Sequence, residues 1–170
     1  MRPRTVLFGL MLALIAACSS GPAAPEVGSG ERVCAEGFCI RVPDGWVVEV
    51  GTTYISAHHE LAPDTTFLTA GEVNQQAIAE AAGVVWPAPT PEVERAFWSL
   101  LESAGAGSFD RSERVLGGAE RSWGTHDDGD MWHLLAPTEG THAVGIELRA
   151  PNRSWESHAE FVFDSLVIVP

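Results

Sequence analysis

Apolar and polar residues alternate along much of the chain from residue 38 onward. Residues 38–42 (FCIRV) show the two-residue period of a half-buried strand, and Pro-Asp-Gly at 43–45 is typical of a turn. The same pattern predicts further strands at 46–50, 53–59, 65–73, 109–117, 119–126, 130–137 and 142–151, and a short last strand within 166–170. Strands therefore account for most of the predicted structure.

Helical periodicity replaces this alternation in two or three places. The clearest helix is predicted over 91–104, where Thr90 is the expected N-cap and Pro91 fills a position whose N–H has no partner within a helix. Its apolar stripe consists of Val93, Ala96, Phe97, Leu100, Leu101 and Ala104. A weaker helix is predicted over 75–82, and a last helix begins at Ser154. Strand runs divided by helices predict an α+β fold, with a largely antiparallel sheet flanked by two or three helices.

The amino-terminal residues follow a different pattern. Arg2 and Arg4 precede an uncharged apolar run of 13 residues, TVLFGLMLALIAA, whereas a membrane-spanning helix needs roughly 20. These proportions predict a secretory signal peptide over 1–17. The sequence IAAC at 15–18 resembles the lipobox of bacterial lipoproteins, in which the cysteine carries a diacylglyceryl group and becomes the acylated amino terminus. The alternatives are a plain signal peptide with an incidental cysteine and an uncleaved anchor.

The lipobox resemblance implies a location outside the cytoplasm. It predicts lipid anchoring through Cys18 to the bacterial cell membrane or to the outer membrane, where two or more acyl chains, palmitate among them, give a stable anchor. Residues 18–30 are almost entirely small residues, proline and glycine, so we expect a flexible tether there. The folded part then runs from 31 to 170 as a single domain.

The charge of the chain limits its partners. There are 10 Lys+Arg against 23 Asp+Glu, which gives a formal net charge of -13, and every basic residue is arginine. An acidic domain without a basic cluster cannot neutralise many phosphates, so nucleic acid is not expected as a partner. The lack of lysine excludes Schiff-base chemistry and the phosphate-binding P-loop. We expect no cofactor.

Two cysteines remain after the lipobox, both within VCAEGFCI. An exported protein meets an oxidising compartment, so Cys34 and Cys39 are predicted to form a disulfide. With Glu36-Gly37 as a two-residue turn, these two residues face each other across a hairpin, where their β-carbons come within bonding range. Zinc ligation by the pair is the competing interpretation, but it requires two further ligands nearby.

Two segments resemble a known fold family. FCIRVPDGWVVEV at 38–50 and HAEFVFDSLVIVP at 158–170 resemble the opening and closing elements of the PsbP-like α/β/α sandwich, whose bacterial branch includes LpqN-type lipoproteins. The resemblance in element order covers roughly 38–169. It implies an α/β/α sandwich and a mostly non-catalytic role, as an envelope lipoprotein or as an accessory subunit that binds a larger assembly. It implies no catalytic residues.

One hairpin contains residues that suit a divalent cation. In GTHDDGDMWH, an Asp-Gly turn at 128–129 places His126 and His133 on one face of the hairpin. Together with Asp128 and Asp130, they form a candidate metal site, in which carboxylates favour calcium and imidazoles favour zinc. The alternative is an ordinary Asp-Gly turn with a solvated acidic tip.

These observations favour a non-catalytic accessory or binding module for an envelope protein or a small ligand. The alternative is a metal-binding protein or metal-dependent hydrolase that uses the His126/His133 hairpin. The sequence contains no G-x-S-x-G nucleophile motif, so an enzyme is the less favoured class. Trp86 lies in the proline-rich segment VVWPAPTP, where no predicted face buries it, and we expect this loop to belong to a binding surface.

Overall fold

Residues 21–127 and 129–169 are described by a computed structural model of the chain, and they form two antiparallel sheets. The smaller sheet has the strand order β1-β2-β10, and its strands are β1 (Gly30–Ala35), β2 (Phe38–Pro43) and β10 (Val167–Ile168). The larger sheet has the order β3-β4-β5-β9-β8-β7-β6, and its strands are β3 (Trp46–Val50), β4 (Tyr54–His59), β5 (Phe67–Asn74), β6 (Gly107–Arg114), β7 (Glu120–His126), β8 (Gly129–Pro137) and β9 (His142–Ala150).

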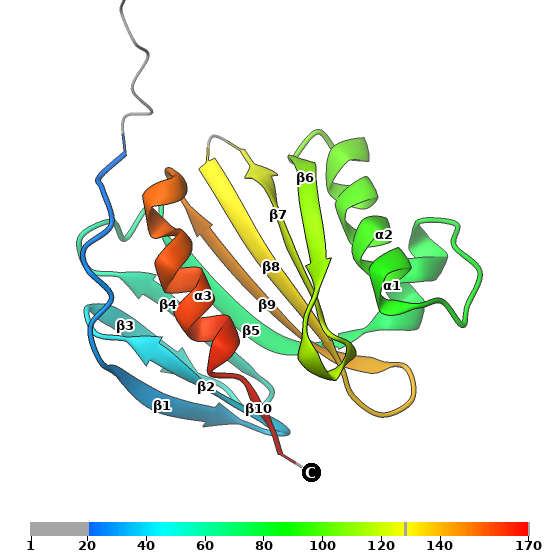
Figure 1. Ribbon diagram of the computed structural model, residues 1–170, viewed down its shortest axis with the longest axis horizontal. Helices are drawn as coiled ribbons and strands as arrows, with labels where there is room; N and C mark the ends of the chain where they lie inside the picture. Colours follow the sequence, from blue (N-terminus) through cyan, green and yellow to red (C-terminus); the bar gives the residue numbers. More distant parts are fainter. Residues whose placement is uncertain (1–20, 128, 170) are drawn as a thin grey trace, which may run out of the picture.

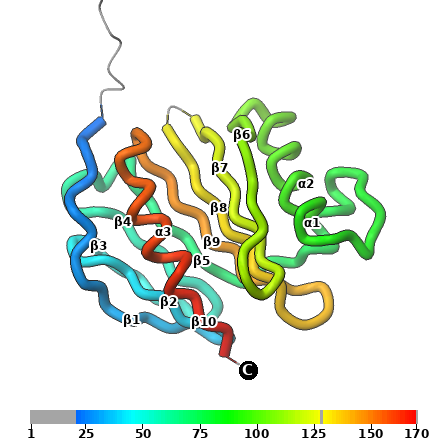
Figure 2. The backbone as a smooth tube through the Cα atoms, in the orientation of Figure 1, coloured from blue at the N-terminus to red at the C-terminus, as the bar shows by residue number. Residues whose placement is uncertain are grey.

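Three α-helices flank the sheets (Figure 1). They are α1 (Gln75–Ala81), α2 (Thr90–Ser103) and α3 (Glu156–Asp164), and two short 3-10 turns, η1 (Leu116–Gly118) and η2 (Arg153–Trp155), complete the described elements. The smaller sheet and α3 cover one face of the larger sheet, and α1 and α2 lie at its β6 end (Figures 1 and 2). The predicted α+β class, with helices flanking antiparallel strands, is therefore confirmed. The sheet itself is divided in two, which the strand pattern did not indicate.

The main core lies between the larger sheet and the layer formed by α3 and β2. Phe38 and Ile40 of β2 and Trp155 at the start of α3 are fully buried, because the alternating strand directs every second side chain into this layer. A second, small cluster of Val93, Leu135 and Ala143 lies beneath α2. The protein thus buries apolar side chains on both faces of the larger sheet, as an α/β/α sandwich requires.

The predicted hairpin disulfide is confirmed. Cys34 and Cys39 are directly opposed in the β1–β2 register and are bonded to each other, and Ala35 is opposed to Phe38 across the two-residue turn. The predicted helix at 91–104 is shifted by one residue, since α2 begins at Thr90 with Pro89 as its N-cap. Its buried side chains also differ from the predicted stripe, because they include Glu94 and Trp98.

Residues 21–29, for which we expect a flexible tether, lie against α3 and against the η2 turn that precedes it. The backbone N–H of Ala24 donates to Ser154 Oγ at 2.8 Å, and Trp155 Nε1 donates to the carbonyl of Pro22 at 3.2 Å. His158 Nε2 lies 3.1 Å from the carbonyl of Pro25. The segment is held through its backbone N–H and carbonyl groups, which nearly every residue possesses, so its composition gave no sign of these contacts. The predicted signal peptide and Cys18 lie outside the described residues, and within those residues no helix is long and apolar enough to cross a membrane.

Candidate functional site

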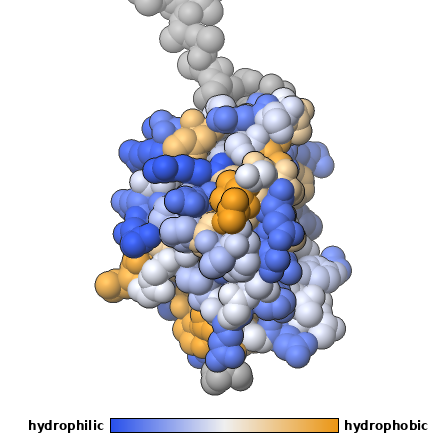
Figure 3. Space-filling model, turned by 90° about the vertical axis from the view of Figure 1, so that its right-hand side faces the viewer, coloured by the Kyte–Doolittle hydropathy of each residue, from blue (hydrophilic) through white to orange (hydrophobic). Residues whose placement is uncertain are grey.

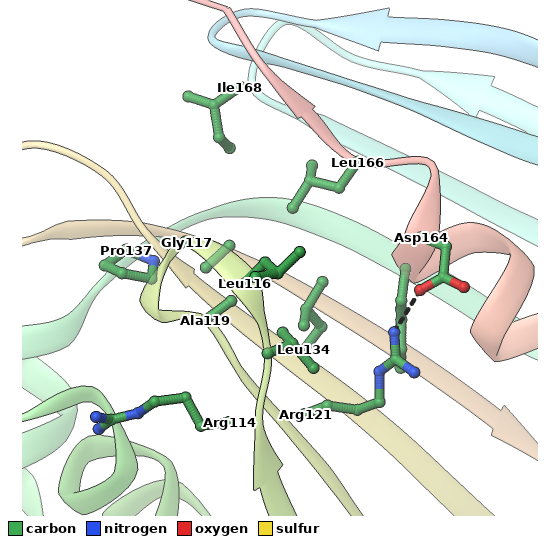
Figure 4. Close-up of a pocket in the computed structure, with 13 residues that line it drawn as sticks. Arg114, Leu116, Gly117, Ala119, Arg121, Leu134, Pro137, Asp164, Leu166 and Ile168 are labelled. Atoms are coloured by element: carbon green, nitrogen blue, oxygen red, sulfur yellow. Dashed lines mark hydrogen bonds and ion pairs between the residues drawn. The ribbon is translucent and has the colours of Figure 1, made fainter.

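A groove of about 860 Å³ lies between the C-terminal segment and the turn η1 (Figure 4). Ligand sites in proteins commonly have volumes of this order. We call it the apolar groove, because most of its lining side chains are apolar: Val115, Leu116, Ala119, Leu134, Ala136, Pro137, Phe163, Leu166 and Ile168. Arg114, Arg121 and Asp164 supply its charged groups.

Two segments distant in sequence form the walls of the apolar groove. On one side, Leu116 is 98% exposed at the start of η1, where Gly117 and Gly118 both have positive φ angles (78° and 79°) that favour glycine. On the other side, Leu166 and Ile168 follow α3, and Figure 4 shows both on the opposite wall from η1. The tight glycine turn thus holds a leucine in solvent next to the groove.

The groove is bounded at one end by an ion pair. Arg121 donates to Asp164 at 2.6 Å (Figure 4), and its guanidinium carbon lies 5.6 Å from the ring centre of Phe163. At another side, a second hollow of about 600 Å³ shares Pro137 and Ile168 with the groove and reaches Val169. The apolar surface continues into this hollow only along Pro137, Ile168 and Val169, because Glu36, Glu72, Glu139 and His142 also line it. Such a surface can bind an apolar group, but it brings together no nucleophile and general base.

The described members of the candidate metal site do not converge. In the β7–β8 register, His126 is opposed to Gly129 and Ser122 to His133, so the two histidines are four residues apart along the hairpin, or about 13 Å. Asp130 lies on the opposite face of the hairpin from the two histidines, where its Oδ1 is 3.7 Å from Arg153 Nε. The turn lies nearer to residue 127 than the Asp-Gly signal predicted, and Asp128 is outside the described residues. No group of three or more His, Cys, Asp or Glu residues suited to a metal occurs in the described part of the chain.

His133 instead belongs to a buried cluster beneath α2. Its Nδ1 lies 2.7 Å from Glu94 Oε1, and the same oxygen accepts hydrogen bonds from Ser122 Oγ at 2.5 Å and Trp98 Nε1 at 3.1 Å. Burial alone lowers the pKa of His133, but the Glu94 carboxylate, its hydrogen bond and the charge of Glu147 outweigh burial and raise this pKa. The cluster therefore favours a protonated imidazole paired with a buried carboxylate.

This cluster does not have the order of a catalytic triad. A triad requires the histidine to accept a proton from the serine, whereas Ser122 donates directly to Glu94, and both residues are fully buried. Sequence reasoning missed Glu94 and Ser122 as interacting residues. One available signal was the pair of small residues Ser122 and Gly124, two positions apart in β7 and therefore on one face. Gly124 leaves room there for the Trp98 ring, which would lie 2.5 Å from an added Cβ.

The structure places Trp86 differently from the expectation of an unburied side chain. Trp86 is half-buried and packs against the small cluster beneath α2, together with Ala88. Its neighbour Val85 is 85% exposed. The side of the molecule that carries α1 and α2 is mainly hydrophilic, and its hydrophobic patches are small and separate (Figure 3). This side offers less continuous apolar surface than the apolar groove.

Solved structures with a similar fold include a cyanobacterial PsbP protein and a mycobacterial cell-envelope protein. The solution structure of cyanobacterial PsbP (CyanoP) from Synechocystis sp. PCC 6803 has a TM-score of 0.56 and 11% identity, over 87% of this chain and 98% of that one. The crystal structure of LpqN, involved in cell envelope biogenesis of Mycobacterium tuberculosis, has a TM-score of 0.54 and 13% identity, over 82% of this chain and 90% of that one. No family model matches the chain, and no curated protein sequence matches it. The predicted PsbP-like fold is confirmed, and at these identities the similarity establishes the fold alone.

Proposed function

We propose that the protein is a non-catalytic binding module of the bacterial cell envelope, which is anchored by lipid at Cys18 and binds an apolar segment of a partner protein at the apolar groove. One observation carries this proposal. Leu116, Ile168 and Val169 are 98%, 41% and 41% exposed, and they gather around adjoining hollows instead of being scattered. Single exposed apolar side chains are common on soluble proteins, whereas contiguous ones mark interaction sites.

The arrangement of the two ends of the chain supports this function. The N-terminal segment joins the domain at the end of the molecule opposite the C-terminus and the apolar groove (Figure 1). Cys18 is three residues before Gly21, and three residues span about 10 Å at most. Since residues 21–29 pack on the domain, a lipid on Cys18 would hold the domain close to the membrane with the groove directed away from it.

The comparison with LpqN is consistent with a place in the envelope, because that protein is described as involved in cell envelope biogenesis. No observation favours the alternative of a metal-dependent hydrolase. The histidines of the candidate hairpin lie apart, and the Ser122 hydroxyl is already engaged by a buried carboxylate.

The proposal is tested by crosslinking from defined positions in the native host. A photoreactive amino acid at position 116 should give one discrete crosslinked product, and the same group at position 61 should not, because Leu61 is also exposed (69%) but is not part of the groove. Ile168→Glu should abolish the product by placing a charge in the apolar contact. Identical products from both positions, or a product that survives Ile168→Glu, would contradict the proposed docking surface.

A further inference from the structure

Residues 21–29, which we call the linking segment, lie against a buried cluster of aromatic side chains near the start of α3 (Figure 2). Its members are Trp46 of β3, His59 of β4, Trp155 of η2 and His158 of α3, and none is more than 8% exposed. The ring centre of Trp155 lies 4.8 Å from that of His59 and 5.1 Å from that of His158, and the two histidine ring centres are 5.9 Å apart. We call these four residues the histidine–tryptophan cluster.

Hydrogen bonds fix His158 in one neutral form. Its Nδ1 accepts a hydrogen bond from Trp46 Nε1 at 3.3 Å, and its Nε2 donates to the carbonyl of Pro25 at 3.1 Å. The carbonyl cannot donate and the indole N–H cannot accept, so the proton of the neutral imidazole is on Nε2. A second proton would have to go to Nδ1, where it would face the indole N–H and break that bond.

His59 is constrained in the same way. Its Nδ1 accepts a hydrogen bond from the backbone N–H of Leu61 at 3.1 Å, and its Nε2 is buried without a hydrogen-bond partner among the described residues. A second proton would face the Leu61 N–H, and a charge on either histidine would repel a charge on the other. The cluster therefore takes up a proton only where water replaces some of its present contacts.

The charged groups around the cluster do not compensate a positive charge on His158. Among the described residues, the histidines that pair with carboxylates are other ones. Glu60, directly after β4, and Glu26, the single charged residue of the linking segment, are both exposed. Arg153 of η2 and Glu156 of α3 are each paired with a side chain outside the cluster.

Burial lowers the pKa of both histidines of the cluster. For His59, the neighbouring His158 lowers the pKa further, and the charge of Glu60 raises it by less. For His158, the hydrogen bond to Pro25 raises the pKa, but by less than burial lowers it. Both side chains are therefore neutral at pH 7, in agreement with their hydrogen bonds.

The linking segment is the part of the cover over the cluster that opens at the lowest cost. It contains no helix or strand, and hydrogen bonds with the side chains of Asn152, Ser154, Trp155 and His158 hold it on η2 and α3. Its end nearest β1 is held separately, because Ser29 Oγ donates to Asp44 at 2.7 Å. Access to the cluster from the other side requires the β3–β4 ladder to break. Segments outside regular structure open locally more often than paired core strands.

We propose that the histidine–tryptophan cluster is a pH-sensitive switch, which holds the linking segment at neutral pH and releases it from η2 and α3 when His158 is protonated. Lifting the segment admits water to the imidazole, and water then replaces the contacts with Trp46 and Pro25. The pKa of His158 is below 6.5 when the segment is bound and about 6.5 when it is released. The bound form is therefore favoured above pH 6.5, and the ratio of released to bound protein rises by up to about tenfold for each pH unit below it.

The consequence at the membrane rests on the lipid anchor of the proposed function, whereas the release itself does not. The released residues 21–29 span about 30 Å at most. Acidification would therefore let a domain anchored at Cys18 move farther from the membrane and present the apolar groove to more distant partners.

Electron paramagnetic resonance from position 26 tests the switch on the full-length protein in detergent. A nitroxide is coupled to p-acetylphenylalanine at this exposed position, so the cysteines stay unlabelled. We expect a mainly immobile label at pH 7.5, and the ratio of mobile to immobile label should rise at least about tenfold between pH 6.5 and pH 5. Far-ultraviolet circular dichroism should stay unchanged over this range, because both sheets remain folded. A label with the same mobility at all these pH values would overturn the switch.

Three variants assign the response to the cluster. His158→Gln keeps a neutral donor and acceptor but cannot be protonated, so its label should show no change in mobility down to pH 5. Ser154→Ala removes the acceptor of the Ala24 N–H and should raise the ratio of mobile to immobile label about fivefold at each pH. His142→Gln is the matched control, because the His142 side chain is 50% exposed and lies outside the cluster, and it should respond like the wild type.

A pH response that persists in His158→Gln, or one that disappears in His142→Gln, would overturn the switch. A mobile label that appears only together with a loss of circular dichroism would overturn it as well, since the whole domain would then be unfolding. None of these results depends on the crosslinks from position 116, so the switch and the proposed function fail separately.

Discussion

Replacement of Glu94 by alanine tests the buried cluster beneath α2 directly. In the wild type, Glu94 Oε1 accepts hydrogen bonds from Ser122, His133 and Trp98. Trp98 Nε1 keeps a second acceptor, Ser122 Oγ at 2.7 Å, but the imidazole of His133 loses its carboxylate inside the protein. Removing one partner of a buried charge pair typically costs 3–5 kcal/mol.

The expected loss lies near the lower end of that range. Glu94 Oε2 is buried without a hydrogen-bond partner among the described residues, so its removal relieves part of the cost. We therefore expect Glu94→Ala to lower the free energy of unfolding by about 3 kcal/mol and the melting temperature by about 10 °C. Glu92→Ala is the matched control on the same helix, because Glu92 is exposed, and it should cost less than about 1 kcal/mol.

The loss should also depend on pH. Because the pKa of His133 is raised in the folded protein, the charge pair contributes fully below the unfolded histidine pKa of about 6.5, and its contribution disappears as the pH rises through the raised value. Guanidinium unfolding followed by tryptophan fluorescence at pH 6 and pH 9 should thus show a larger difference between wild type and Glu94→Ala at pH 6. A loss below about 1 kcal/mol, or an equal loss at both values, would refute the charge-pair interpretation.

Three further changes test other parts of the structure. Replacing Cys34 and Cys39 together by serine should cost about 2 kcal/mol in denaturant unfolding, because the closed loop is short; a wholly unfolded double variant would contradict this. Burial lowers the pKa of His158, although its hydrogen bond to Pro25 opposes the effect, so wild-type stability should fall as the pH decreases below about 6.5. His158→Gln should flatten that dependence between pH 7 and pH 5, and an unchanged slope would argue against it. Cys18→Ser should move the protein from the membrane fraction to the soluble fraction or block its maturation, and unchanged fractionation and mass would exclude lipidation.

Short sequence patterns were sufficient to predict the first strand after the disulfide hairpin turn, the turns on either side of it and the end of α2. The two-residue period at 38–42 gave a strand, the following Pro-Asp-Gly gave its turn, and the Glu36-Gly37 turn set the register that brings Cys34 and Cys39 together. Gly105, with a φ angle of 69°, follows the end of α2 as expected. These features are decided by the backbone preferences of a few adjacent residues, so the sequence was sufficient to predict them.

Only the tertiary structure decided which distant residues meet. Glu94, in a helix with a polar face, has the sequence signature of a solvated residue, yet it is buried because Ser122 and His133 approach it from strands 28 and 39 residues further along the chain. The β7–β8 register separated His126 from His133, which the local turn signal had placed together. The apolar groove likewise forms between η1 and the C-terminal segment. A register shift or a helix docking position is fixed by packing over the whole sheet, and residue periodicity specifies the face of an element but not its partner across the fold.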